Sequence, residues 1–100
     1  MTLNNKFIIR PTATFKQELT NAVYYIKHIL KEPNIANNFY KTVIRKISSL
    51  NFMPYRYPKV YGYETIRRLP VNKYVIIYEV DNNTRASLHL TYFSLQSKLF

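Results

Sequence analysis

The sequence predicts an α+β fold in a single domain that spans residues 1–100. Two observations support this prediction. Apolar residues recur first in a short run, then with the three- to four-residue period of helices, and finally with the two-residue period of strands. The segments between the predicted elements are short, which requires neighbouring elements to run antiparallel. We therefore expect an N-terminal strand, an antiparallel helix hairpin and a three-stranded antiparallel meander, in that order.

The first two predicted elements are a short strand and a helix. Residues 7–9 form an apolar run that Pro11 ends, as is typical of a short strand. Thr14 and Gln17 have the spacing of a capping box, which predicts that the helix begins at Thr14. The helix has an apolar stripe on one face, and Pro33 prevents its continuation. The stripe consists of Phe15, Leu19, Val23, Ile26 and Leu30, widened by Ala22 and Ile29.

A second helix is predicted to begin near Pro33 or Asn34, because proline is tolerated in the first turn, and to end before Met53 and Pro54. Only a residue or two separates the helices, so they must fold back as a hairpin and turn their apolar stripes toward a shared surface. That surface must come from the second half of the chain. The second stripe consists of Ala36, Phe39, Val43, Ile47 and Leu50.

The second half of the chain begins with an aromatic and proline-rich connector over residues 51–63, which we expect to be an ordered loop. Three strands are then predicted, separated by turn-forming residues. The middle strand is apolar at both odd and even positions. One of its faces can therefore pack on the helices, which leaves the other as a partly aromatic groove. The predicted strands are residues 64–69, 74–80 and 85–93, and the turns are residues 70–73 and 81–83.

The composition is strongly basic. Fifteen lysines and arginines stand against five acidic residues, for a formal net charge of +10. A net charge of about 2 to 8 in magnitude is enough to keep a small domain soluble. The excess therefore indicates an anionic partner, either nucleic acid or an acidic protein. A positive surface that only maintains solubility is the alternative.

Several classes of site are not indicated. The chain has no cysteine, which excludes disulfides and thiolate metal sites. His28 and His89 have no further ligand at metal-binding spacing, so we expect neither metal nor cofactor. His28 is interpreted as a surface residue and His89 as a structural or surface residue, with a general base as the alternative for His89. No apolar stretch has the length of a membrane span or a signal peptide, so we expect a cytoplasmic protein.

Several motifs, in matching order and spacing, resemble those of the RelE/ParE toxin superfamily. Residues 66–81 are similar to its signature R-x-L-x-V-x-x-Y-x-I-x-Y-x-V. Ile9, Pro11 and Ala13 resemble the opening I-x-P-x-A, and residues 50–54 resemble the L-x-x-x-P that follows the second helix. The resemblance covers nearly the whole chain.

This resemblance implies the toxin of a type II toxin-antitoxin system, which arrests growth when its antitoxin is degraded. Members of the superfamily either cut mRNA on the ribosome or poison DNA gyrase. The resemblance also implies a hetero-oligomer with a cognate acidic antitoxin, which would wrap the helices or cover the basic groove. Lys41 and Arg45 on the outer face of the second helix are candidate antitoxin contacts, although such a spacing is also typical of a solvated face.

Metal-free cleavage of RNA needs cations that stabilise the phosphorane and groups that transfer protons. Ribosome-dependent members use Lys, Arg and a late Tyr or His for these roles. Arg67 and Arg68 occupy the corresponding basic strand position, and one of them should face the groove because successive strand residues point to opposite faces. The closing pattern L-[HY]-G-R-[RQ]-D corresponds to residues 92–97, in which Gln96 matches. Arg67, Arg68 and Gln96 are therefore the candidate catalytic residues.

Two cations expected from the resemblance are missing. Val75 stands where an arginine follows the tyrosine that matches Tyr74, and Leu95 replaces an arginine of the closing pattern. We expect growth arrest by ribosome-dependent mRNA cleavage. The alternatives are gyrase inhibition without nuclease activity, and a non-catalytic nucleic-acid-binding module. The candidate target-binding residues are Lys73, Tyr92, Lys98, Arg56 and Lys59.

Overall fold

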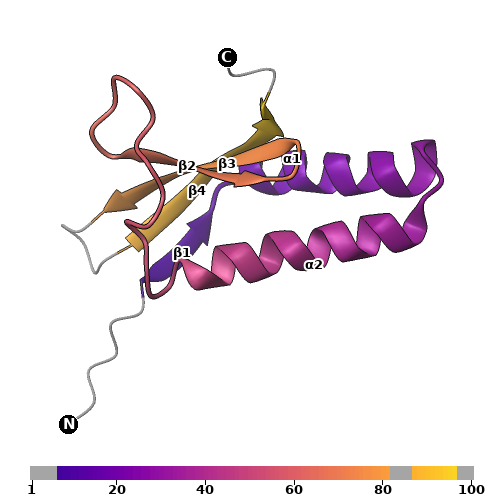
Figure 1. Cartoon of the computed structure of the whole chain (residues 1–100), viewed down its shortest axis with the longest axis horizontal. Helices are drawn as coiled ribbons and strands as arrows, with labels where there is room; N and C mark the ends of the chain where they lie inside the picture. The colour runs from indigo at the N-terminus through magenta and orange to yellow at the C-terminus, as the bar shows by residue number, and fades with distance from the viewer. Residues whose placement is uncertain (1–6, 82–86, 97–100) are drawn as a thin grey trace, which may run out of the picture.

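A computed structural model of the chain describes residues 7–81 and 87–96. Helices α1 and α2 run side by side, and their hairpin turn extends well beyond the sheet (Figure 1). This arrangement confirms the predicted α+β fold class. The elements are strand β1 (Ile8–Pro11), helix α1 (Ala13–Tyr24), the π-helical turn η1 (Tyr25–Ile29), helix α2 (Pro33–Ser49), and strands β2 (Ile66–Val71), β3 (Tyr74–Asp81) and β4 (Ser87–Leu95).

The strands form one sheet with the order β1-β4-β3-β2. Strands β2, β3 and β4 are the predicted antiparallel meander. Strand β1 adds to the far edge of the meander and runs parallel to β4, with Ile8 opposite Ser87 and Pro11 opposite Leu90. A parallel pair needs a long crossover, and the helix hairpin with the first two strands of the meander supplies it.

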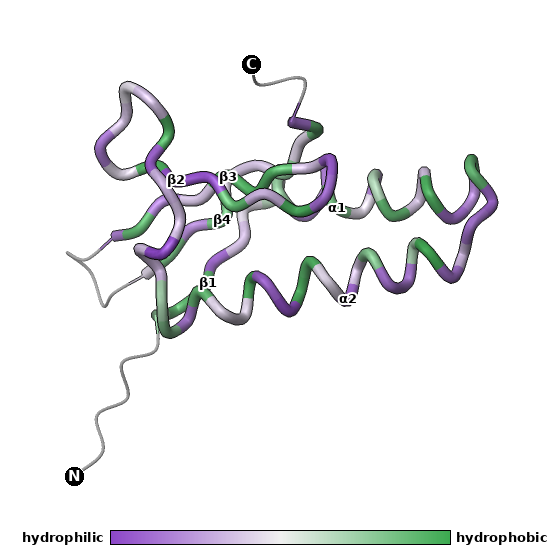
Figure 2. The backbone as a smooth tube through the Cα atoms, in the orientation of Figure 1, coloured by the Kyte–Doolittle hydropathy of each residue, from purple (hydrophilic) through white to green (hydrophobic). Residues whose placement is uncertain are grey.

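The hydrophobic core lies between the helix hairpin and one face of the sheet. All five residues of the stripe predicted for the second helix are buried, so that prediction is confirmed. On the sheet, alternate residues of β3 meet the helices, and burying each such side chain fully contributes about 1.5–3 kcal/mol. Hydrophobic residues recur at intervals along both helices in Figure 2. The core includes Phe15, Leu19, Phe39, Val43, Ile47, Leu69, Val71, Ile76, Tyr78, Val80, Leu88, Leu90 and Phe93.

Helix α1 begins at a different cap from the predicted one. The N-cap is Thr12, whose side-chain oxygen accepts a hydrogen bond from the backbone N–H of Phe15 at 3.1 Å. Thr14 lies exposed within the first turn, so the capping-box prediction was wrong. The physical reason is tertiary, because the Thr12 hydroxyl also donates a hydrogen bond to the carbonyl of Thr91 in β4 at 3.0 Å. One side chain therefore fixes both the helix start and its attachment to the sheet.

The first helix ends in a π-helical turn rather than a regular α-helical one. The N–H of Leu30 bonds to the carbonyl of Tyr25 at 3.0 Å, five residues back. Lys31 then adopts a left-handed conformation, with φ 57°, which turns the chain into α2. Only the early part of the predicted stripe is buried, whereas Ile29 and Leu30 are exposed on the part of the hairpin that extends beyond the sheet.

The strand boundaries differ from the predicted ones by a few residues. Pro70 lies in β2, opposite Val75, and not in the turn. An edge strand accommodates proline because its outward N–H has no partner in the sheet. The turn therefore consists of Asn72 and Lys73, with Asn72 at φ 55°, a conformation that asparagine tolerates well. Residues 82–86, which hold most of the other predicted turn, lie outside the described residues.

Candidate functional site

Alternation along the strands gives the sheet two faces. The face away from the helices, called the open face below, carries Arg10 of β1, Arg68 of β2, Glu79 of β3, and His89 and Tyr92 of β4. Arg10 and Tyr92 are exposed, and the other three side chains are half-buried. The open face thus brings together cationic, acidic and aromatic groups from all the strands of the sheet.

One row of side chains crosses the open face near the end of β1. Arg10 lies opposite His89, and His89 lies opposite Glu79. The hydroxyl of Thr65 donates a hydrogen bond to the Glu79 carboxylate at 2.7 Å. The carboxylate is therefore oriented by a neighbouring side chain, with an imidazole on the adjacent strand.

A second row places Arg68 opposite Ile77, and Ile77 opposite Tyr92. Ile77 is buried, so Arg68 and Tyr92 flank an apolar strip on the open face. A β-bulge lies between the two rows, where the register shifts between Ile77 and Tyr78. Thr91 is the extra residue of β4 there, and its hydroxyl donates to the carbonyl of Ile77 at 2.8 Å. The bulge keeps both His89 and Tyr92 on the open face, which a regular strand would not do.

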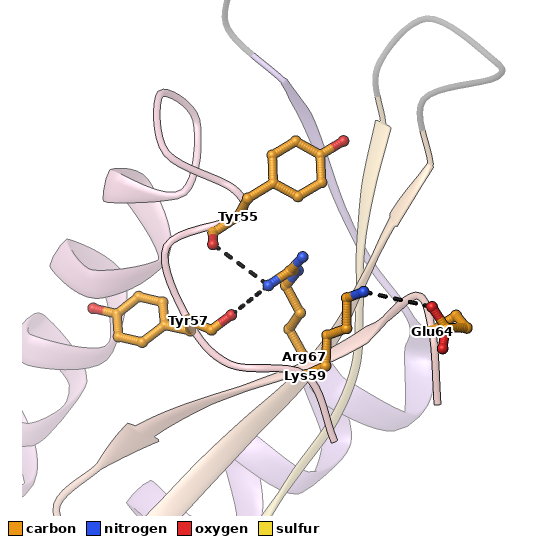
Figure 3. A network of polar contacts seen from close by, with 5 residues as sticks. All are labelled: Tyr55, Tyr57, Lys59, Glu64 and Arg67. Atoms are coloured by element: carbon orange, nitrogen blue, oxygen red, sulfur yellow. Dashed lines mark hydrogen bonds and ion pairs between the residues drawn. The ribbon is translucent and has the colours of Figure 1, made fainter. Parts of the chain in front are cut away.

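Arg67 lies on the opposite face from its neighbour Arg68. Its Nη1 donates hydrogen bonds to the carbonyls of Tyr57 at 2.7 Å and Tyr55 at 3.4 Å, as Figure 3 shows. Its guanidinium also lies over the Tyr55 ring, 5.1 Å from the centroid. The prediction that one arginine would face the open side is thus resolved in favour of Arg68, whereas Arg67 holds the connector against the edge of the sheet.

The connector has further attachments to the sheet. The Tyr78 hydroxyl donates to the carbonyl of Pro54 at 2.8 Å, and burial raises the pKa of this tyrosine to about 12, against an opposing effect of the Arg67 charge. The N–H of Arg68 bonds to the carbonyl of Pro58 at 3.1 Å, so the connector runs along the outer edge of β2. The connector is therefore an ordered loop, as predicted.

Gln96 is a turn residue in this structure. Its side-chain Nε2 donates to the carbonyls of Asn72 at 2.9 Å and Tyr74 at 3.2 Å. Its backbone N–H bonds to the carbonyl of Lys73 at 2.8 Å. The amide thus closes the β2–β3 turn, on which Lys73 is exposed.

The other predicted site residues are spread over several surfaces. Arg56 and Lys59 lie exposed in the connector, with the Arg56 guanidinium 5.5 Å from the centroid of the Tyr57 ring. Lys41 and Arg45 are exposed on α2, and Lys98 lies outside the described residues. Sequence reasoning missed Arg10, because the parallel pairing that brings it beside His89 joins distant parts of the chain.

Two hollows lie against the helix hairpin and not on the open face. The larger, of about 1160 Å³, separates the hairpin from the β2–β3 turn and includes Tyr74 and Phe93, whose rings stack at 4.9 Å. Burial raises the pKa of Tyr74, and Tyr25 adds to the effect. Glu18 also lines it and accepts a hydrogen bond from the N–H of Phe93 at 2.8 Å. The second hollow, of about 630 Å³, lies between the two helices beside β1.

Neither a metal-binding cluster nor a membrane-spanning helix occurs in the part of the chain that the structure describes. No group of three or more His, Asp or Glu side chains there is arranged to hold a metal ion. No helix there is long and apolar enough to cross a membrane.

Comparison with known proteins adds independent findings. The family model for the ParE toxin of the type II toxin-antitoxin system parDE matches residues 9–88. A chain of the chromosomal ParDE TA system from P. aeruginosa superposes with a TM-score of 0.73 at 12% identity, covering 91% of this chain and 97% of that one. At such identity the likeness shows the fold alone. No match was found among the curated proteins.

Two further solved structures share the fold. A chain of the E. coli DinJ-YafQ toxin-antitoxin complex has a TM-score of 0.63 at 16% identity, covering 95% of this chain and 98% of that one. YafQ from E. coli strain BL21(DE3) has a TM-score of 0.60 at 17% identity, covering 95% of this chain and 99% of that one.

Proposed function

Because this chain belongs to the ParE toxin family of type II toxin-antitoxin systems, we propose that it arrests growth by inhibiting DNA gyrase without cutting RNA. The surface that contacts the target in this proposal is the open face, to which Arg68 of the edge strand β2 contributes a cation. The cognate antitoxin neutralises the toxin by binding it.

One observation favours a binding mechanism over a catalytic one. Arg67 and Gln96, two of the three candidate catalytic residues, direct their side-chain donors to backbone carbonyls of their own chain. A cation that stabilises a phosphorane must instead direct its donors at the phosphate. Inhibition of gyrase asks only for a binding surface, which the open face supplies.

A second candidate is ribosome-dependent mRNA cleavage, the interpretation that the sequence motifs favour. It is supported by the open face, where Arg68 of β2 lies across β3 from His89 and Tyr92 of β4. Histidine and tyrosine are residue types that transfer protons, and arginine stabilises developing negative charge. In this mechanism Arg68 would act on the phosphate, with His89 and Tyr92 as the proton-transfer groups.

The two candidates leave different traces in the same cells. The test is brief induction of the toxin, followed by a supercoiling assay on a reporter plasmid and by mapping of transcript ends. We expect loss of negative supercoiling without new transcript ends. New transcript ends with unchanged supercoiling would support cleavage and contradict the proposal, and growth that continues would point to a plain nucleic-acid-binding module.

Two adjacent substitutions test the assignment of the open face. We expect Arg68→Ala to weaken growth arrest, because its side chain lies on the open face. We expect the matched variant Arg67→Ala to lower the free energy of unfolding by about 1–3 kcal/mol, because charged hydrogen bonds to the connector carbonyls are lost. Growth assays and urea unfolding of both variants measure the two effects. Full growth arrest by a folded Arg68→Ala variant would remove the open face from the mechanism.

For the antitoxin, we propose an acidic segment that docks on the outer face of α2. Lys41 and Arg45 are exposed there one helical turn apart, and the adjacent Tyr40 and Ile44, which line the hollow between the helices beside β1, are exposed as well. Paired cations beside paired apolar side chains suit an amphipathic acidic helix.

A further inference from the structure

The connector ends in an exposed tip that contains two tyrosines. Tyr61 is 98% exposed and Tyr63 is 57% exposed, with Gly62 between them. Figure 1 shows the connector at the opposite end of the molecule's long axis from the helix hairpin turn. Tyr61 is the most exposed of the large hydrophobic residues that the structure describes, and the two rings lie two residues apart on one loop, so one ligand can contact both.

The tip has a defined backbone conformation. The N–H of Val60 bonds to the carbonyl of Ile66 at 2.8 Å, and the N–H of Tyr63 bonds to the carbonyl of Val60 at 3.0 Å. Gly62 has φ 86°, which glycine adopts without the strain that a side chain would cause. These bonds close the tip into a turn that presents both rings from a fixed backbone.

The base of the connector is attached to the sheet. Arg67 bonds to the carbonyl of Tyr57, and the hydroxyl of Tyr78 bonds to the carbonyl of Pro54. The Lys59 ammonium lies 3.5 Å from the Glu64 carboxylate across the neck of the tip, drawn in Figure 3. The loop therefore loses little conformational entropy when a ligand binds the rings.

The charge around the tip favours an anionic ligand. Arg56 and Lys59 lie in the same connector, and Arg68 lies in the strand beside it. Glu64, which directly follows the connector, is the one acidic residue in the stretch 51–65, and Lys59 neutralises it. The whole chain carries a formal net charge of +10.

We propose that the tip binds single-stranded nucleic acid, with unpaired bases stacked on Tyr61 and Tyr63 and phosphates held by the neighbouring cations. Stacking on aromatic rings beside basic side chains is the usual mode for single strands and does not depend on base sequence. A protein partner fits less well, because interface aromatics lie within broader apolar patches, whereas Tyr61 stands beside glycine at the end of a narrow turn. The inference goes beyond gyrase inhibition and does not rest on it.

The test is binding of the purified chain to short fluorescent oligonucleotides, measured by anisotropy with single-stranded RNA, single-stranded DNA and duplex DNA. We expect tighter binding to single strands than to the duplex. The double variant Tyr61→Ala, Tyr63→Ala should lose about tenfold or more in affinity. The double variant Tyr61→Phe, Tyr63→Phe should keep wild-type affinity, because it keeps the rings. The relative affinity for RNA and DNA identifies which single strand is the ligand.

The matched control is Tyr24→Ala, which removes a tyrosine of similar exposure, 58%, from α1. It should bind like the wild type. Equal affinity of the double alanine variant, an equal loss in the Tyr24 variant, or a preference for duplex would each overturn the proposal. If the chain binds no oligonucleotide but the double alanine variant loses growth arrest, the tip contacts a protein and the proposal is wrong. Because this assay contains neither gyrase nor ribosome, its outcome is separate from that of the proposed function.

Discussion

Arg67 and Arg68 are adjacent in the sequence, but strand β2 directs their side chains to opposite faces of the sheet. The Arg67 guanidinium satisfies two carbonyls of the connector and covers one aromatic ring. Lysine would not replace it, because an ammonium lacks the planar guanidinium that lies over the Tyr55 ring. Two residues of the same type therefore have separate roles, one in the fold and one on the open face.

Tyr78 provides a prediction about stability and pH. Burial raises its pKa to about 12 in the folded protein, against about 10 in the unfolded chain. Its contribution to stability is thus fully present below about pH 10 and is lost as the pH rises toward 12. In this window the unfolding free energy of the wild type should fall by up to about 1.4 kcal/mol per pH unit because of Tyr78. We expect Tyr78→Phe to lack this fall. Urea unfolding between neutral pH and pH 12 measures the difference between the two proteins.

At neutral pH the same variant should be less stable by about 1 kcal/mol, because the carbonyl of Pro54 loses its donor. Tyr24→Phe, at an exposed position on α1, is the control and should follow the wild type at every pH. If the wild type and Tyr78→Phe lose stability equally above pH 10, ionisation of the Tyr78 hydroxyl does not affect folding and the prediction is wrong.

At the scale of elements, the start of α1 depends on one threonine. Thr12 accepts from the N–H of Phe15 and donates to the carbonyl of Thr91. We expect Thr12→Ala to lower the free energy of unfolding by about 1–2 kcal/mol, since a cap and a link to β4 are both lost. Thr14→Ala, two residues along, should change it by less than about 0.5 kcal/mol, because Thr14 is exposed. Thermal or urea unfolding of both variants gives the comparison, and equal losses would mean that Thr12 is not the effective cap.

The β2 edge of the sheet is protected from pairing with other chains. The connector bonds to its first half, through Val60 to Ile66 and Arg68 to Pro58. Pro70 occupies its second half and lacks an N–H donor. The connector thus protects an edge strand and also presents the exposed tip with Tyr61 and Tyr63.

At the scale of the whole molecule, the charge of +10 determines how partners approach. Attraction between this basic chain and the acidic antitoxin segment that we propose would raise the association rate and be screened by salt. We expect Lys41→Glu, Arg45→Glu to weaken antitoxin binding about tenfold or more, because acidic side chains would then face an acidic segment. Surface plasmon resonance at several salt concentrations measures the rates and the affinity.

The control for that prediction is Lys27→Glu, Lys31→Glu, which changes the net charge equally but at the end of the hairpin. It should slow association without the same loss of affinity. If both double variants lose the same affinity, the effect belongs to the overall charge and α2 is not the docking face.

The order of the helices and strands and the buried stripe of α2 were predictable from the sequence, because the period of apolar residues reports directly which side of a helix or strand is buried. The sequence also predicted that the side chains of Arg67 and Arg68 point to opposite faces of the sheet, which follows from strand geometry alone. Which of the two arginines lies on the open face, which threonine caps α1, and the parallel pairing of β1 with β4 could be known only from the tertiary structure. These outcomes depend on contacts between residues up to 79 positions apart in the chain. Such contacts leave no local pattern, since their free energy arises only when distant segments have already packed together.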